Sequence, residues 1–240
     1  MKPTVLFLFN SSDYAVRPWL DDGRFNVVSV DYDDTDHAEA HSAPAEGHTR
    51  LSIDLAQPSA VDVVKWALVR RGMACRPSLV VSFAPCTDLS VAGARHFAAK
   101  LAANPDCQYR AVRMARVAEL FGCPYYVENP VSVLSTMWRK PDQIVHPCDF
   151  AGYLSLEEGP HPEFPQVIPE RDRYRKKTCL WIGHGAPTLT LASMEPLEED
   201  NPGWAKLGGK SARTKYIRSL TPRGMAMAIY WANAARILKV

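Results

Sequence analysis

Short apolar runs separated by polar turns recur along the first half of the chain. A short, continuous apolar run bounded by turn residues is typical of a strand that is buried on both faces of a parallel sheet. The first run, TVLFLF, breaks into a polar turn directly after Phe9. Five such runs predict strands at residues 4–9, 25–30, 51–53, 79–84 and 125–127.

Helical periodicity appears between these runs and again at the end of the chain. In the segment Ala60–Arg70, for example, Val61, Val64 and Leu68 recur at the spacing of one helix face. The alternation of strand and helix predicts a doubly wound, largely parallel α/β sheet of the Rossmann-like class. Helices are predicted at residues 14–20, 60–70, 109–121 and 223–238.

The periodicity fades between residues 141 and 202, where Pro, Gly and charged residues are frequent. One further strand is predicted in this stretch, at residues 178–182. We therefore expect a catalytic domain formed by residues 1–140 and 203–240. Residues 141–202 are predicted to form a small irregular insert that serves as a recognition lobe.

Composition narrows the class of protein without naming a function. The chain has 240 residues, of which 47% are hydrophobic and 22% charged, and this balance is typical of a soluble globular domain. We find neither an apolar run long enough to span a membrane nor a signal peptide at the start, so we expect a cytoplasmic protein. The net charge of +2 permits nucleic-acid binding without demanding it. The six cysteines lack CxxC spacing, which favours reduced thiols, and the His and Cys residues lack standard zinc spacing, so we expect no metal.

Two neighbouring predicted strands end in residues that could carry chemistry. Pro85 and Cys86 follow the strand at 79–84, and Glu128 and Asn129 follow the strand at 125–127. Open α/β sheets place their ligands at the carboxyl ends of their strands. A thiolate that adds to carbon 6 of cytosine, with an acid at ring nitrogen N3, would activate carbon 5 toward an electrophile. The alternative is that Cys86 is an ordinary small apolar residue.

These motifs resemble those of a known enzyme family. Ser82–Ser90 resembles the catalytic Pro-Cys loop of the DNA cytosine-C5 methyltransferases, and Val127–Pro130 resembles their Glu-Asn motif. The order of the two motifs and their separation of about 40 residues also match. Residues 173–181 are similar to the basic strand that supplies an arginine, and Thr221–Asn233 resembles the C-terminal helix of small, phage-type members.

The resemblance implies transfer of a methyl group to C5 of cytosine in DNA through a covalent cysteine adduct. Cys86 would be the nucleophile and Glu128 the acid, and an arginine at 173 or 175 would orient the base. The alternative interpretation of the arginines is a solvated cationic face. The implied catalytic set is Cys86, Glu128, Arg173, Arg175, Pro85 and Asn129.

The same resemblance implies S-adenosylmethionine as the cofactor. Asp31 would hold its ribose and Asp54 its adenine, although each could also be an exposed turn acid. Phe9, Asn10 and Ser11 would lie beside its methionine part. Family members usually carry a glycine-rich turn there, which lets the backbone approach a ligand closely, whereas this turn has no glycine.

The expected partner is DNA, double- or single-stranded, or a cytosine nucleotide. The family's recognition domain is long, whereas only the insert of residues 141–202 is available here. Two alternatives therefore stay open. The first keeps the cysteine chemistry but uses another one-carbon donor or a free pyrimidine nucleotide. The second is a catalytically silent DNA-binding paralogue.

Overall fold

The computed structural model is built on one mostly parallel sheet, and it describes residues 1–10, 12–32, 46–197, 207 and 211–239. The sheet has seven strands in the order β3-β2-β1-β4-β5-β7-β6, and β7 is antiparallel to both of its neighbours. The predicted α/β class is therefore confirmed. The strands are β1 Thr4–Leu8, β2 Asn26–Asp31, β3 His48–Ser52, β4 Leu79–Phe83, β5 Tyr125–Pro130, β6 Gln143–Val145 and β7 Thr178–Gly183.

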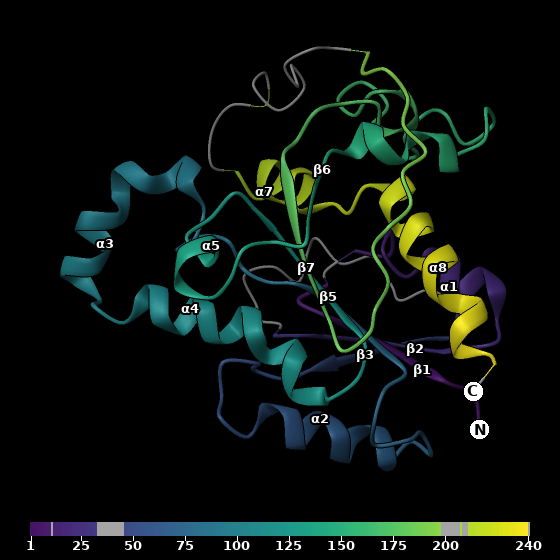
Figure 1. Ribbon diagram of the computed structural model, residues 1–240, viewed down its shortest axis with the longest axis horizontal. Coiled ribbons are helices and arrows are strands. Elements are labelled where there is room, and N and C mark those ends of the chain that lie inside the picture. The colour runs from purple at the N-terminus through teal and green to yellow at the C-terminus, as the bar shows by residue number, and fades with distance from the viewer. Residues whose placement is uncertain (11, 33–45, 198–206, 208–210, 240) are drawn as a thin grey trace.

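Helices cover both faces of this sheet (Figure 1). One core contains Val64 of α2 and Ala115 of α4, and the other contains Trp19 of α1 and Ile229 of α8. None of the helices in the described part of the chain is long and apolar enough to cross a membrane. The α-helices are α1 Arg17–Asp22, α2 Ala60–Val69, α3 Phe97–Ala103, α4 Cys107–Arg116, α5 Leu134–Met137, α7 Ala212–Ser219 and α8 Arg223–Ile237, and the 3-10 helices are η2 Val91–His96, η3 Val117–Phe121, η4 Pro147–Tyr153 and η5 Glu170–Asp172.

Strand β1 shows why the sequence pattern is continuous rather than alternating. Leu6 and Leu8 belong to the core on one face of the sheet, whereas Val5 and Phe7 belong to the core on the other. Successive side chains of a strand point to opposite faces, so a strand covered on both sides is apolar at every position. The same two-sided burial produces the apolar runs that predicted β2, β4 and β5, whereas the edge strand β3 is only partly buried.

The predicted insert differs from the observed structure. Strands β6 and β7 both come from residues 141–202, and they extend the main sheet beyond β5. Trp181 of β7 is fully buried. Elsewhere in this stretch Ile168 and Tyr174 form a small core together with Ile217 of α7. The region is thus partly integral to the sheet, and its short strands and 3-10 turns explain why its periodicity is weak.

The strand order fixes where a ligand site can form. The chain winds from β1 toward β2 and β3 on one side, and from β4 toward β5 on the other. The boundary between β1 and β4 is therefore a topological switch point, and doubly wound sheets bind ligands in the crevice outside it. Phe9 follows β1 and Ala84 follows β4, so the turns after both strands meet at this edge.

Candidate functional site

A cavity of about 660 Å³ opens at the carboxyl ends of β1, β4 and β5. Its volume falls within the range of small-molecule sites in proteins. The strand ends form one wall, and the segment that joins α7 to α8 forms the other. The lining residues are Phe9, Asn10, Ser12, Phe83, Ala84, Pro85, Cys86, Ser90, Ala92, Glu128, Pro130, Lys176, Thr178, Arg218, Ser219, Leu220, Thr221, Pro222 and Met225.

Cys86 lies at the mouth of this cavity on an ordered turn. Its carbonyl oxygen accepts hydrogen bonds from the backbone N–H groups of Leu89 (3.0 Å) and Ser90 (2.9 Å). The Lys100 ammonium of α3 donates to the carboxylate of Asp88 at 2.8 Å. These contacts hold the loop in one shape, and Cys86 is exposed at its tip.

Asn129 fastens the Cys86 loop to the neighbouring strand. Phe83 pairs with Glu128 across β4 and β5, so the cysteine and the acid extend from adjacent strand ends. The side chain of Asn129 is fully buried, and its Nδ2 donates to the carbonyl oxygen of Ala84 at 2.7 Å. The two residues of the predicted Glu-Asn pair therefore have different roles: Glu128 lines the cavity, and Asn129 positions the loop.

The two reactive groups influence each other electrostatically. Burial raises the pKa of the Glu128 carboxyl, and the Lys176 ammonium opposes this. The surrounding protein also raises the pKa of the Cys86 thiol, the charge of Glu128 raises it further, and Lys176 and Lys100 act in the opposite sense. Both shifts favour the neutral forms, a thiol and a carboxylic acid. Within the described part of the chain, the Glu128 carboxyl has no hydrogen-bond partner.

Neither predicted arginine reaches the cavity. The Nε of Arg173 donates to the carbonyl oxygen of Glu195 at 2.7 Å, and Arg175 is exposed. Tyr174 between them is buried, and Lys176 lines the cavity instead. The basic strand predicted at residues 173–181 is shorter in the structure, because β7 begins only at Thr178 and both arginines precede it. The cation near Glu128 is therefore a lysine.

Only some of the residues predicted to hold the cofactor line the cavity. Phe9 and Asn10 line the cavity, whereas Ser11 lies outside the described residues. The carboxylate of Asp31 at the end of β2 accepts from the backbone N–H of Tyr32 at 2.9 Å. The carboxylate of Asp54 accepts from the backbone N–H of Ala56 and from the side chain of Gln57, which stabilises the turn before α2. Neither Asp31 nor Asp54 lines the cavity.

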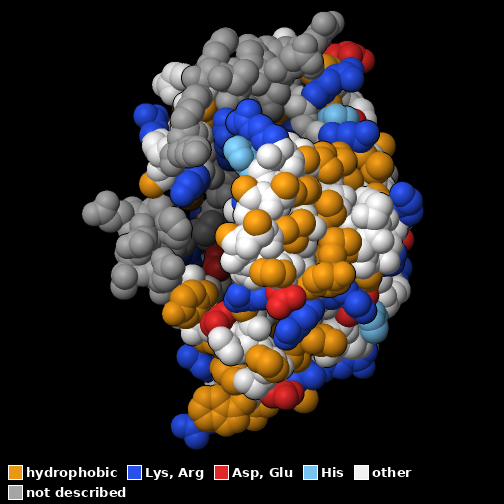
Figure 2. All heavy atoms as spheres, turned by 90° about the vertical axis from the view of Figure 1, so that its left-hand side faces the viewer, with side chains coloured by type: hydrophobic (Ala, Val, Ile, Leu, Met, Phe, Trp, Pro, Cys, Tyr) orange, Lys and Arg blue, Asp and Glu red, His pale blue; other side chains and the backbone are white. Residues whose placement is uncertain are grey.

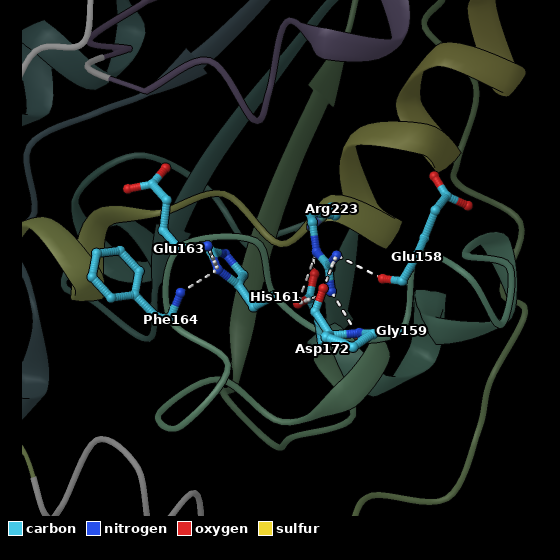
Figure 3. Close-up of polar contacts among 8 residues, drawn as sticks. Glu158, Gly159, His161, Glu163, Phe164, Asp172 and Arg223 are labelled. Carbon is cyan, nitrogen blue, oxygen red and sulfur yellow. Dashed lines mark hydrogen bonds and ion pairs between the residues drawn. The ribbon is translucent and has the colours of Figure 1, made fainter.

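The far wall of the cavity is held by an ion pair that the sequence did not reveal (Figure 3). Asp172 is buried, and its carboxylate accepts from the backbone N–H of Arg223 at 2.6 Å and from the Arg223 guanidinium at 3.2 Å. The guanidinium also donates to the carbonyl oxygens of Glu158 and Gly159. These contacts anchor the start of α8 directly after the lining segment 218–222. The partners are 51 residues apart, so no local pattern signals them.

His161 lies close to this ion pair but has a structural role. Its Nδ1 accepts from the backbone N–H groups of Glu163 (3.3 Å) and Phe164 (3.1 Å), as Figure 3 shows. Burial lowers the pKa of His161 to about 4, so the ring is neutral at physiological pH. Among the described residues, no group of three or more His, Cys, Asp and Glu side chains could hold a metal ion.

The surface next to the Cys86 loop is mixed in character. Figure 2 shows the side of the molecule on which α3 lies, with hydrophobic side chains gathered centrally and both basic and acidic residues around them. No residue of α3 is buried. This side therefore does not carry charge of a single sign.

Comparisons with known proteins return only weak likenesses. No family model matches the chain, and no curated protein does. One solved structure that matches is a short chain dehydrogenase family protein from Francisella tularensis subsp. tularensis SCHU S4, at 11% identity and a TM-score of 0.31, covering 50% of this chain and 43% of that one. Another is a short chain dehydrogenase from Leptospira borgpetersenii serovar Hardjo-bovis (strain JB197) with bound NAD+, at 13% identity and a TM-score of 0.28, covering 51% and 48%. The chain thus spans less than half the length of either protein, and the likeness transfers neither substrate nor cofactor.

The family predicted from sequence is wrong. These structures are short chain dehydrogenases rather than DNA cytosine-C5 methyltransferases. The predicted methyl transfer to cytosine and the S-adenosylmethionine cofactor are therefore not retained. The two alternatives, the same cysteine chemistry with another donor or substrate and a silent DNA-binding paralogue, assumed the same family and are not retained as functions, whereas the expected DNA or nucleotide partner stays a prediction.

Proposed function

We propose that this chain is an enzyme in which the Cys86 thiol adds to an electrophilic carbon of a small anionic ligand, with Glu128 as the proton relay. One observation carries the proposal. The Glu128 carboxyl has no hydrogen-bond partner in the described part of the chain, and it lines the same cavity as the thiol whose pKa it raises. Perturbed titratable groups that share a cavity are typical of catalytic sites.

The protonation states determine the chemistry. Because burial favours the protonated form of Glu128, its hydroxyl can donate a proton while its other oxygen accepts one. When the thiol adds across a polarised double bond, the S–C bond forms and the π electrons move to the far atom. Glu128 gives its proton to that atom and receives the proton of the Cys86 sulfur. The acid ends in its starting state, and the step needs neither an oxidant nor a reductant.

The charges at the cavity indicate the kind of ligand. Lys176 and Arg218 both line it, and Glu128 carries no charge when it is protonated. Cations that line a largely apolar cavity favour a ligand with a carboxylate or phosphate group. The DNA or nucleotide partner expected from the sequence stays a prediction.

A pair of electrophiles tests the relay directly. Acrylamide needs a proton when a thiol adds to it, whereas iodoacetamide only loses iodide. We expect Glu128→Gln to slow acrylamide addition at Cys86 by at least about tenfold, because a general acid typically contributes about 10²–10⁴ to a rate. Reaction of the same variant with iodoacetamide should not slow. The rates are measured by peptide mass spectrometry.

Two controls complete this experiment. Cys75 is also exposed, so its reaction with each reagent serves as an internal reference within the same molecule. Cys86→Ser identifies the peptide signal that belongs to the proposed nucleophile. If Glu128→Gln slowed neither reagent, or slowed both equally, the relay would be refuted.

A further inference from the structure

A chain of buried polar groups runs from the cavity across three neighbouring strands. Asn10 follows β1, Ser29 lies on β2, and His48 begins β3. The Nδ2 of Asn10 lies 2.9 Å from the carbonyl oxygen of Ser12 and 3.0 Å from the Oγ of Ser29. The ring nitrogens of His48 lie 2.8 Å from that Oγ and 3.1 Å from the carboxylate of Asp13.

The two groups at the ends of this hydrogen-bonded series, the Ser12 carbonyl and the Asp13 carboxylate, can only accept hydrogen bonds. This fixes which group donates in each bond between them. The Ser12 carbonyl requires the amide nitrogen of Asn10, rather than its oxygen, to face it. At the other end, burial acts to raise the pKa of Asp13, but hydrogen bonds from His48 and Arg50 outweigh it and lower the pKa, so the carboxylate is ionised. The hydrogen of His48 therefore sits on Nδ1.

The remaining bonds follow from this assignment. With its hydrogen on Nδ1, the His48 ring accepts at Nε2 from the hydroxyl of Ser29. The oxygen of Ser29 then accepts from Asn10. Both amide hydrogens of Asn10 are thus engaged by the protein, one to Ser12 and one to Ser29.

One polar atom of Asn10 remains. The residue lines the cavity and is only 5% exposed, yet its Oδ1 has no partner among the described residues. We infer that Asn10 Oδ1 accepts a hydrogen bond from an amino or hydroxyl group of the ligand. This inference rests on the proposed function, in which the cavity holds a small anionic ligand. It makes that ligand bifunctional, with an anion near Lys176 and a donor near Asn10.

Ser29 and His48 are positioning residues for this acceptor. An asparagine amide can usually turn over and exchange its donor for its acceptor. Here a turned amide would place Oδ1 against the Ser12 carbonyl, and two acceptors would face each other. The polar chain therefore keeps an acceptor, and not a donor, at this end of the cavity.

Two benzoates of matched shape test the subsite. Both 4-aminobenzoate and 4-methylbenzoate carry the anion, but only the first has a donor at the opposite end. We expect 4-aminobenzoate to protect Cys86 from iodoacetamide at about fivefold lower concentration, because one hydrogen bond contributes about 1 kcal/mol. Asn10→Leu should abolish this preference. Circular dichroism confirms that the variant is folded.

A second measurement needs no variant and no ligand. The ¹⁵N shifts of the His48 ring report which nitrogen carries the hydrogen, and the inference requires Nδ1. A hydrogen on Nε2 alone would overturn it, as would equal protection by the two benzoates or protection by neither. The proposed function is judged separately, by acrylamide addition to Cys86 in Glu128→Gln. The two ideas can therefore fail independently.

Discussion

Among the described residues, two carboxyl groups have a pKa that burial raises above its ordinary value, and they differ in what surrounds them. Asp172 accepts hydrogen bonds from the backbone and guanidinium of Arg223, and this pair anchors the start of α8 directly after the segment that lines the far wall of the cavity. Glu128 stands on the near wall and has no hydrogen-bond partner among the described residues. Asp172 is buried and its carboxylate is paired, which indicates a structural role, whereas the partly buried Glu128 carboxyl lines the cavity without a hydrogen bond from the described protein, which favours a role in chemistry.

The largest expected effect follows from breaking the satisfied pair. Asp172→Ala removes the carboxylate that pairs with the Arg223 guanidinium. It also leaves the backbone N–H of Arg223, at the start of α8, without its acceptor. Removal of one partner of a buried ion pair typically costs about 3–5 kcal/mol. We expect the free energy of unfolding to fall by that amount in urea titrations. Glu128→Gln is the matched control, and it should change stability by less than about 1 kcal/mol.

The outcome that contradicts the comparison is specific. If Glu128→Gln lowered the free energy of unfolding as much as Asp172→Ala does, then Glu128 would be a structural carboxyl. The assignment of chemistry to its lack of a partner would then fail. If both variants instead lost little free energy of unfolding, and lost it equally, Asp172 would not be needed to stabilise the far wall.

An intermediate effect is expected at the residue next to Glu128. Asn129→Ala removes the hydrogen bond to the carbonyl oxygen of Ala84 and leaves that buried oxygen without its donor. An unsatisfied buried group costs about 1–3 kcal/mol. We expect a loss of stability in this range, together with faster hydrogen exchange in the loop around Cys86. Asn129→Asp checks the cause, because a carboxylate cannot donate to Ala84 and should be at least as destabilising.

Local patterns predicted the elements of the fold that depend on local burial. The strand β1 was recognised because both of its faces are covered, and Gly122 ends η3 in the left-handed conformation expected of a helix end. The apolar runs also located Cys86 and Glu128 at neighbouring strand ends, and the structure places Glu128 within the last residues of β5 and Cys86 in the loop after β4. Strand β6 was missed because three residues carry too little periodicity to recognise.

What the sequence could not show depends on contacts between distant segments. The choice of Lys176 over Arg173 or Arg175 depends on where β7 begins, and a shift of one residue reverses which side chains face the cavity. The pairing of Asp172 with Arg223 joins two segments that share no pattern. The family was assigned from short motifs at two strand ends, and such motifs can recur in unrelated proteins.

The smallest expected effect concerns the pH dependence of Cys86, and it isolates the charge of Glu128. Burial raises the pKa of the thiol, and Glu128 raises it further. Glu128→Gln removes the second contribution, which acts where Glu128 is ionised, so in that pH range the pKa of the thiol falls and more thiolate is present at a given pH. We expect the profile of iodoacetamide reaction at Cys86 to move to lower pH by less than about one unit.

Lys176→Met provides the opposite test, because the ammonium of Lys176 lowers the pKa of Cys86. Its profile should move to higher pH, while the profile of the exposed Cys75 stays fixed in both variants. Shifts of opposite sign would show that Glu128 and Lys176 both act electrostatically on the pKa of the Cys86 thiol. A shift of the same sign in both variants would mean that the substitutions act by altering burial, and the contrast between the paired and the unpaired carboxyl would lose its electrostatic basis.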